Sequence, residues 1–414
     1  MFTKVHLRIL LLLFVAMTAR MSRGFAAEES LIEGGTPLRG MADCGYGTDS
    51  STDLHHGYAR GVFCNNLDFY IAPDTGTRVR FLAELNLEPG FSDQGIGIDT
   101  ERLQVGYTFS NQLTAWIGRF HTPMGFYVIA YHHGSLLQTA VEKPRFLDWE
   151  DHYGVLPVHT TGIWLNGQQV FSAGRLSYMA YGGNGSKMND DQFTNIDMNM
   201  VHDDNTNMAL GARLTWFFNG ALDGLQVGLS ALAESVDYAP QMGKGTASSW
   251  TGNANANHNV NDTFFSSKIS IMALHAVYES GPWEFLNEFY NFENSAENIV
   301  GTDNTSGTPT QTTNSASTGT KNSTAGYTQL AYWVDARWAP YVRYEWGDFN
   351  TKDPFFLGQY NGLPYIRSAL GGRYNLNDQS AVKLEFATTH FKASSFENPG
   401  NDYNQVRFDY AIRF

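Results

Sequence analysis

Five of the chain's 12 histidines lie in one stretch: His121, His132, His133, His152 and His159. Imidazole nitrogens are common metal ligands, but a metal site needs them to converge to about 2.1 Å from one ion. His132 and His133 are adjacent, and adjacent side chains of an extended segment point in opposite directions. The pattern therefore favours a polar connecting segment, and it predicts neither a metal site nor a cofactor.

Two other groups of residues could carry chemistry. The run 133–135, His-Gly-Ser, suggests a hydrolase nucleophile, but no ordered set of Ser, His and Asp or Asn on strands accompanies it, as a catalytic triad requires. The sequence therefore predicts no catalytic residues and no enzymatic activity. Asp190, Asp191, Asp203 and Asp204 lack the glycine-centred spacing of a calcium loop. A solvated acidic loop is favoured, with weak divalent-cation binding as the alternative.

Residues 1–26 have the features of a secretory signal peptide. Lys4 and Arg8 precede an apolar run, and the small residues Gly24 and Ala26 stand at positions −3 and −1 of a cleavage site after Ala26. Beyond this point no window approaches the roughly 20 apolar residues of a spanning helix. Removal of the signal leaves 23 of the 27 basic residues against 41 acidic ones, a net charge of −18. Such an acidic chain is not expected to bind nucleic acid.

Cys44 and Cys64 are the only two cysteines. In an exported protein, such a pair is expected to form a disulfide. The bond would tie the N-terminal segment, 27–60, to the strands that follow it. Neither a CxxCH motif nor paired CxxC motifs occur, so the sequence indicates no covalent haem and no zinc site.

Period-2 alternation recurs along the chain. From Val406 to Phe414, apolar residues alternate with polar or small ones without a break, and the chain ends on Phe414. Similar alternation covers 103–109, 208–218, 225–231 and 382–386. A strand with one face in an apolar phase and the other in water requires this pattern.

The connections between these segments alternate between short and long. Tight turns are predicted near 110–111, 166–167, 219–224, 280–282 and 375–379, and long polar connections near 121–156, 182–206, 238–262, 296–324, 348–363 and 393–403. Short turns at one rim and long loops at the other are typical of an outer-membrane barrel. The sequence predicts an all-β transmembrane antiparallel barrel over 61–414, with one further strand within 40–60. This gives about 16 strands, in a range of 14 to 18.

Aromatic residues and one low-complexity stretch support a barrel with short turns at one rim and long loops at the other. The turn-side ends of strands carry Phe109, Trp216, Phe218, Trp283, Trp338, Tyr374 and Phe414, as an interfacial aromatic girdle would. Residues 300–325 are nearly free of apolar groups and are predicted to form a mobile outer loop.

With these features, the chain resembles Gram-negative outer-membrane porins. Residues 118–125, Gly-Arg-Phe-His-Thr-Pro-Met-Gly, are similar to the Gly-x-Phe-x-x-Pro-x-Gly element of phosphate-selective-porin-like proteins. Phe414 resembles the terminal residue that the barrel-assembly machinery recognises. The resemblance implies passive diffusion of small polar solutes and ions across the outer membrane. It also implies that outer-membrane lipid surrounds the barrel, and it leaves a homotrimer as one option for its assembly. Phosphate selectivity does not carry over, because no ladder of lysines is present. The alternatives are a barrel adhesin or structural protein, and the barrel sheath of an electron-transfer conduit.

If apolar positions face lipid, the alternate positions face the pore. One wall would be basic, with Arg78, Arg80, Arg102, Arg367, Arg373, Lys383, Arg407 and Arg413, and the far wall acidic, with Glu234, Glu284, Glu288 and Glu345. We expect a transverse field and a weak cation preference that salt screens. Alternatively, many of these charges pair across strands.

The connection 121–156 contains large aromatic residues that a solvent-exposed loop would not need, namely Tyr127, Tyr131, Phe146 and Trp149. It is predicted to fold inward and narrow the pore. The alternative is that it packs over the mouth or in a subunit interface.

Overall fold

The structure is a computed structural model that describes residues 38–49, 60–92, 95–132, 134–148, 155–188, 196–197, 207–238, 264–303, 310–312, 319–353, 355–356, 362–393 and 401–414. The predicted signal peptide, His133, His152, Trp149 and the four aspartates at 190, 191, 203 and 204 lie outside the described residues.

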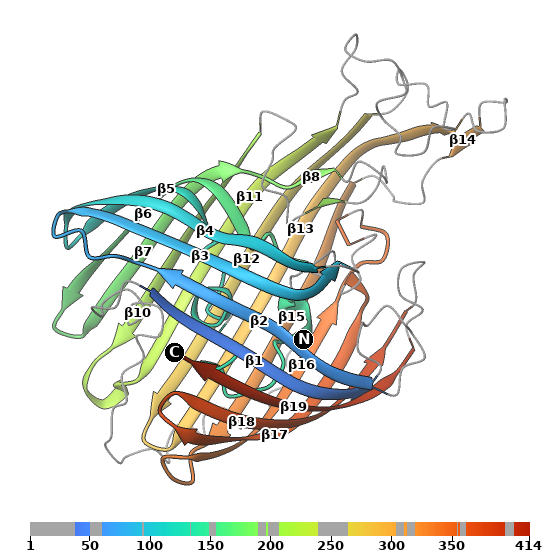
Figure 1. Cartoon of the computed structure of the whole chain (residues 1–414). Coiled ribbons are helices and arrows are strands. Elements are labelled where there is room, and N and C mark those ends of the chain that lie inside the picture. The colour runs from blue at the N-terminus through green and yellow to red at the C-terminus, as the bar shows by residue number, and fades with distance from the viewer. Residues whose placement is uncertain are drawn as a thin grey trace.

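The chain is all-β, and its long strands follow one another around a single closed sheet (Figure 1). The strands of the wall are β1 (Leu38–Asp49), β2 (Arg60–Ile71), β3 (Val79–Ser92), β4 (Gly95–Ser110), β5 (Leu113–His121), β6 (His159–Phe171), β7 (Gly174–Asn184), β10 (Met208–Phe218), β11 (Leu225–Tyr238), β12 (Phe264–Ser280), β13 (Trp283–Asp303), β15 (Gly319–Tyr332), β16 (Trp338–Asp348), β17 (Tyr365–Asn377), β18 (Ser380–Phe391) and β19 (Tyr403–Arg413). These strands number sixteen, as predicted. The short β14 (Thr310–Thr312) pairs with β13, and β8 (Lys187–Met188) pairs with β9 (Ile196–Asp197).

Every pair of neighbouring wall strands is antiparallel, and β1 pairs with β19 to close the barrel. At the seam, Gly40 and Phe414 exchange two backbone hydrogen bonds of 2.9 Å. A Cβ atom at Gly40 would lie 2.4 Å from the Phe414 ring, so a larger residue here would displace this ring. Among the described residues, the first wall strand is β1, which begins at Leu38, two residues before the range 40–60 in which one further strand was predicted.

Two connections differ from the predictions. A turn was predicted at 166–167, but β6 continues through these residues and the chain turns after Phe171, which pairs with Gly174. Asn166 instead pairs with Met179 of β7 and accepts a hydrogen bond from the Trp116 indole, so tertiary pairing overrides the local turn signal. The predicted outer loop 300–325 is partly strand, because β13 extends to 303 and β15 begins at 319.

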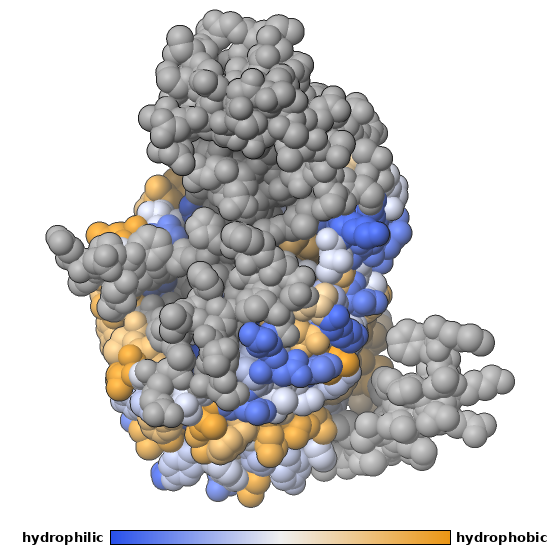
Figure 2. Space-filling view, turned by 90° about the vertical axis from the view of Figure 1, so that its right-hand side faces the viewer, coloured by the Kyte–Doolittle hydropathy of each residue, from blue (hydrophilic) through white to orange (hydrophobic). Residues whose placement is uncertain are grey.

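The outer face of the wall is apolar. In the C-terminal strand Phe408 is exposed whereas Arg407 and Asp409 are buried, and the same inside–outside alternation holds in β10 for Leu210 and Leu214 against Arg213. On the face shown in Figure 2, hydrophobic residues form a band above a rim of hydrophilic ones. Among the described residues, no helix is long and apolar enough to cross a membrane.

Aromatic residues gather at the turn-side rim. Ring pairs there include Trp283 with Tyr332, Trp338 with Tyr374, Phe69 with Phe414 and Tyr107 with Phe109, at centroid distances of 4.7, 6.5, 6.0 and 4.9 Å. Such rings suit the interface between lipid and water.

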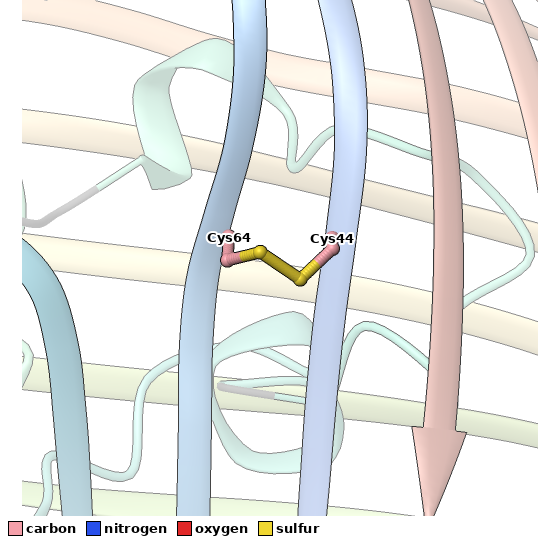
Figure 3. Close-up of a disulfide and its surroundings, with 2 residues drawn as sticks. All are labelled: Cys44 and Cys64. Carbon is pink, nitrogen blue, oxygen red and sulfur yellow. A yellow bond between two sulfur atoms is a disulfide. The ribbon is translucent and has the colours of Figure 1, made fainter.

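A disulfide joins Cys44 of β1 to Cys64 of β2 (Figure 3). Both residues are exposed on the outer side of the wall, where the register between the two strands shifts at Asp43–Gly45. The bond therefore links adjacent strands next to the barrel seam.

Candidate functional site: the lumen and its internal segment

The connection between β5 and β6 is here called the internal segment, and its described residues, 122–132, 134–148 and 155–158, lie inside the barrel. It contains one helical turn, α3 (Tyr127–Ala130), and a 3-10 turn, η2 (Arg145–Leu147). Tyr127, Tyr131 and Phe146 are almost completely buried, in one cluster with wall residues such as Tyr290 and Phe292. The prediction that this connection folds inward is confirmed, and the segment is visible within the barrel in Figure 1.

The first anchor of the internal segment is Glu288 on β13. Its carboxylate accepts hydrogen bonds from the backbone N–H groups of Phe126 and Tyr127, at 2.8 and 2.9 Å. It also accepts bonds from the hydroxyls of Tyr290 and Tyr327, at 3.0 and 2.9 Å. One buried carboxylate thus satisfies four donors, two of them backbone groups at the start of a helical turn, where no intrahelical partner exists.

The two glycines of the porin-like element 118–125 have clear structural reasons. Gly118 has a φ of +139°, and a Cβ there would lie 2.0 Å from the Leu103 carbonyl. Gly125 has a φ of +63°, and a Cβ there would lie 2.0 Å from the Glu288 carboxylate. Gly125 is held on both sides, since its N–H bonds to the Ser230 hydroxyl and its carbonyl accepts from Arg213. The element therefore turns the chain from the wall into the lumen.

A second anchor surrounds Glu142 of the internal segment. Its carboxylate contacts Arg407 at 2.6 Å and Arg367 at 3.3 Å, and its backbone carbonyl accepts from Arg343 at 2.7 Å. Burial alone would raise the pKa of Glu142, but the guanidinium groups of Arg407, Arg367 and Arg343 prevail and lower it to about 2. The carboxylate is therefore charged at neutral pH.

The wall around this anchor is itself paired. Glu345 accepts from the backbone N–H of Arg145 at 2.7 Å and contacts the Arg343 guanidinium at 2.7 Å. Arg367 also contacts Glu385 at 3.2 Å. Three arginines and three carboxylates thus form one network between the wall and the internal segment.

A third anchor binds the backbone between these two. Lys383 donates to the carbonyls of Ser135 and Ala140, at 2.5 and 3.1 Å, and contacts Asp409 at 3.0 Å. Arg373 donates to the carbonyls of Leu136 and Gln138 at 2.6 and 2.9 Å. Glu284 accepts from the Thr139 hydroxyl at 2.6 Å.

The remaining residues of the two predicted walls fall into two groups. Arg78, Arg80 and Arg413 are exposed near the turn-side ends of their strands. Arg102 is buried and contacts Glu84, and Glu234 is buried and accepts from the backbone N–H and hydroxyl of Ser186. Their assignment as pore-lining residues remains a prediction, because most of the buried ones bind the internal segment or another wall residue.

Sequence reasoning did not single out Glu142 of the internal segment. It also did not single out the wall residues Ser230, Tyr341 and Tyr365, which bind this segment over separations of 105 residues or more along the chain. It also did not anticipate that His121, His132 and His159 meet.

No family model matches the sequence, and no curated protein sequence matches it. Solved structures do match over most of their length. An anion-selective porin from Comamonas acidovorans is 12% identical, with a TM-score of 0.55, and the match covers 91% of this chain and 98% of that one. The outer membrane channel DcaP of Acinetobacter baumannii is 10% identical, with a TM-score of 0.52 and coverages of 91% and 96%. OmpF of Salmonella typhi, in complex with daunomycin, is 12% identical, with a TM-score of 0.52 and coverages of 91% and 97%.

These likenesses concern the fold. The chain has the closed, sixteen-stranded architecture of Gram-negative outer-membrane porins and channels.

Proposed function

We propose that this protein is an outer-membrane channel through which small polar solutes and ions diffuse passively, past an internal segment that narrows the lumen. The observation that carries the proposal is the combination of an apolar outer wall, a polar inner wall and a connection held inside by that inner wall. An adhesin or a structural barrel would not require a long connection to be folded into its lumen.

The pathway should be narrow. Glu345, Lys383 and Glu385 are 0%, 1% and 1% exposed, although their strand positions face the lumen. Packing against the internal segment therefore leaves little space at this level. We expect a single-channel conductance below that of a barrel of the same size with an open lumen.

Planar-bilayer recordings test this proposal. The wild-type protein should conduct, and deletion of 128–152 should raise its single-channel conductance. A matched control deletes 241–260 from a predicted outer connection and should leave the conductance nearly unchanged. A wild-type protein that inserts but never conducts would support the adhesin or structural alternative. A deletion variant that conducts like the wild type would refute the constriction.

A weak cation preference is part of the proposal. It is supported by the net charge of −18 and by the pairing of the buried wall charges, which leaves the acidic outer connections as the main source of field. Such a field is screened beyond about 8 Å at physiological salt. Reversal potentials in a tenfold KCl gradient should indicate cation preference that fades as salt rises, and strong anion selectivity would contradict it.

Assembly and topology complete the proposal. We expect the barrel-assembly machinery to recognise the terminal Phe414, so removal of this residue should reduce outer-membrane insertion in cells, whereas Phe414→Tyr should preserve it. Short turns should face the periplasm, so protease added to intact cells should cut within 296–324 and spare 219–224. Cross-linking in native membranes tests whether the chain forms a homotrimer.

A further inference from the structure

Four side chains with metal-binding atoms meet on the inner side of the barrel. They belong to Glu101 of β4, His121 at the end of β5, His132 of the internal segment and His159 at the start of β6. One ligand atom from each lies within 4.8 Å of the others. Glu101, His121 and His132 are 2%, 5% and 4% exposed, so the group is enclosed.

Local strand geometry brings these residues together. His121 and His159 are direct partners in the β5–β6 register, so their side chains leave the same face side by side. In β4, Arg102 pairs with Glu84 and Thr100 with Leu85, so Glu101 is the extra residue of a β-bulge. Consecutive strand residues normally point to opposite faces, and a bulge re-aims one of them. Here the bulge leaves both Glu101 and Arg102 buried.

The side chains of this group lie close together, but the ring nitrogens of His121 form no hydrogen bond with any described residue. Glu101 Oε2 lies 2.7 Å from His159 Nε2 and 3.1 Å from His132 Nε2. The His132 ring stacks on His121 with centroids 3.7 Å apart. Within the part of the chain that the structure describes, neither ring nitrogen of His121 has a hydrogen-bond partner. A buried polar group without a hydrogen-bond partner is costly, and an ion bound to one of these nitrogens would reduce this cost.

We propose that Glu101, His121, His132 and His159 form a binding site for one divalent first-row transition-metal ion, with Zn²⁺ as the best match. Three imidazoles and one carboxylate complete a tetrahedral shell of the kind Zn²⁺ prefers, whereas Ca²⁺ and Mg²⁺ prefer sets of oxygen ligands. Tetrahedral ligands about 2.1 Å from an ion lie about 3.4 Å apart, so ligand atoms already within 4.8 Å of one another need only small side-chain shifts.

Two charged neighbours support the ligand geometry. Glu84 Oε2 lies 3.6 Å from His121 Nε2 and contacts Arg102 Nε at 2.5 Å. A carboxylate beside a ligating imidazole typically orients the ring. Arg102 in turn holds this carboxylate in place.

The position of the site determines which parts of the protein a bound ion would hold together. His121 and His159 flank the internal segment, His132 lies within it, and Glu101 belongs to the wall. A bound ion would therefore fasten both ends of the internal segment and its first third to the barrel. This consequence does not depend on what the channel transports.

Equilibrium dialysis of the full mature chain, folded in detergent without a histidine tag and freed of metal with EDTA, tests the site. Dialysis against Zn²⁺ alone followed by elemental analysis should give one ion per chain, and dialysis against Ca²⁺ alone should give none. His132→Ala and Glu101→Gln should each weaken Zn²⁺ binding at least as much as the roughly 10- to 100-fold that loss of an outer-shell partner costs. His390→Ala is the matched control, because His390 is exposed and forms an ion pair with Asp402, outside the proposed site; this variant should bind Zn²⁺ like the wild type.

Folding is verified for each variant by heat-modifiable migration on gels. His132 lies outside the wall strands, so the barrel should persist in His132→Ala. Zn²⁺ should also raise the melting temperature of the wild type but not of this variant. A wild type that binds no Zn²⁺, or a folded His132→Ala variant that binds it as tightly as the wild type, would overturn the proposal.

Discussion

Replacement of Glu288 by alanine should detach the first part of the internal segment from the barrel wall. In the native protein, this carboxylate accepts from the backbone N–H groups of Phe126 and Tyr127 and from the hydroxyls of Tyr290 and Tyr327. Its side chain is fully buried, so no water replaces it without rearrangement. The variant would leave four buried donors without their acceptor.

The free-energy cost of Glu288→Ala follows from this count of donors. A buried donor left without its partner costs about 1–3 kcal/mol, so four donors cost about 4 kcal/mol at the lower end. Undocking of the segment would restore their hydrogen bonds to water. Because every 1.4 kcal/mol or so is a factor of ten, the population of the undocked state should rise roughly 1000-fold. The second and third anchors remain, so the movement should concern residues near α3 more than those near Glu142.

Single-channel recording in planar bilayers is the assay. Glu288→Ala should spend a much larger fraction of time in a state of higher conductance than the wild type. Glu288→Gln keeps the side-chain volume but replaces one acceptor oxygen with a donor, and it should show a smaller effect in the same direction. Glu293→Ala, an exposed position on the same strand, is the matched control. If folded Glu288→Ala conducts like this control, with no added open state, then Glu288 does not hold the segment and the reasoning fails.

Three further predictions concern the anchor at Glu142, the turn at Gly125 and the disulfide. The folded-state pKa of Glu142 is about 2, below its ordinary 4.5, so its stabilisation of the docked internal segment should be complete above pH 4.5 and be lost as the pH falls toward 2. The noise of the single-channel current, measured from pH 7 to pH 3, should therefore rise only at the acidic end. Glu142→Gln should show raised noise at every pH in this range. Gly125→Ala should destabilise the docked segment by at least the roughly 1–2 kcal/mol of a left-handed residue, seen as faster limited proteolysis, whereas Gly61→Ala, with open space around it, should not. Reduction of the Cys44–Cys64 bond should lower the free energy of unfolding by roughly 3 kcal/mol, measured by denaturant unfolding. Alkylation after reduction should shift the mass, and two freely alkylated thiols in the unreduced protein would contradict the bond.

Much of the wall was predictable because strand alternation is a local property. A residue at an alternate position of a lipid-facing strand must face the lumen, and the structure places Arg213, Glu288 and Lys383 on that side. The terminal strand also appears where its alternation predicts it. The turn predicted at 166–167 failed, because a local Asn-Gly preference competes there with cross-strand pairing to β7.

The His–Glu group was not predictable by the same logic. Adjacent histidines diverge only in an extended segment, and residues 132–133 were expected to be extended. In the structure, His132 follows the turn α3 of the internal segment and reaches the wall. The bulge at Glu101 breaks the alternation that would otherwise send Glu101 and Arg102 to opposite faces. Both effects depend on tertiary structure, and neither leaves a pattern in the sequence.

The buried charges of the lumen follow from what an irregular segment needs inside a closed barrel. All wall strands already pair with two neighbours, so the barrel offers the internal segment no strand edge. Its backbone groups must still be satisfied, because buried N–H and C=O groups without partners are costly. Wall side chains supply those partners: Glu288 and Glu345 accept from its N–H groups, while Arg343, Arg373 and Lys383 donate to its carbonyls. Carboxylates therefore gather where the segment presents donors and cations where it presents acceptors. On this view, these charged wall residues first hold the internal segment in place.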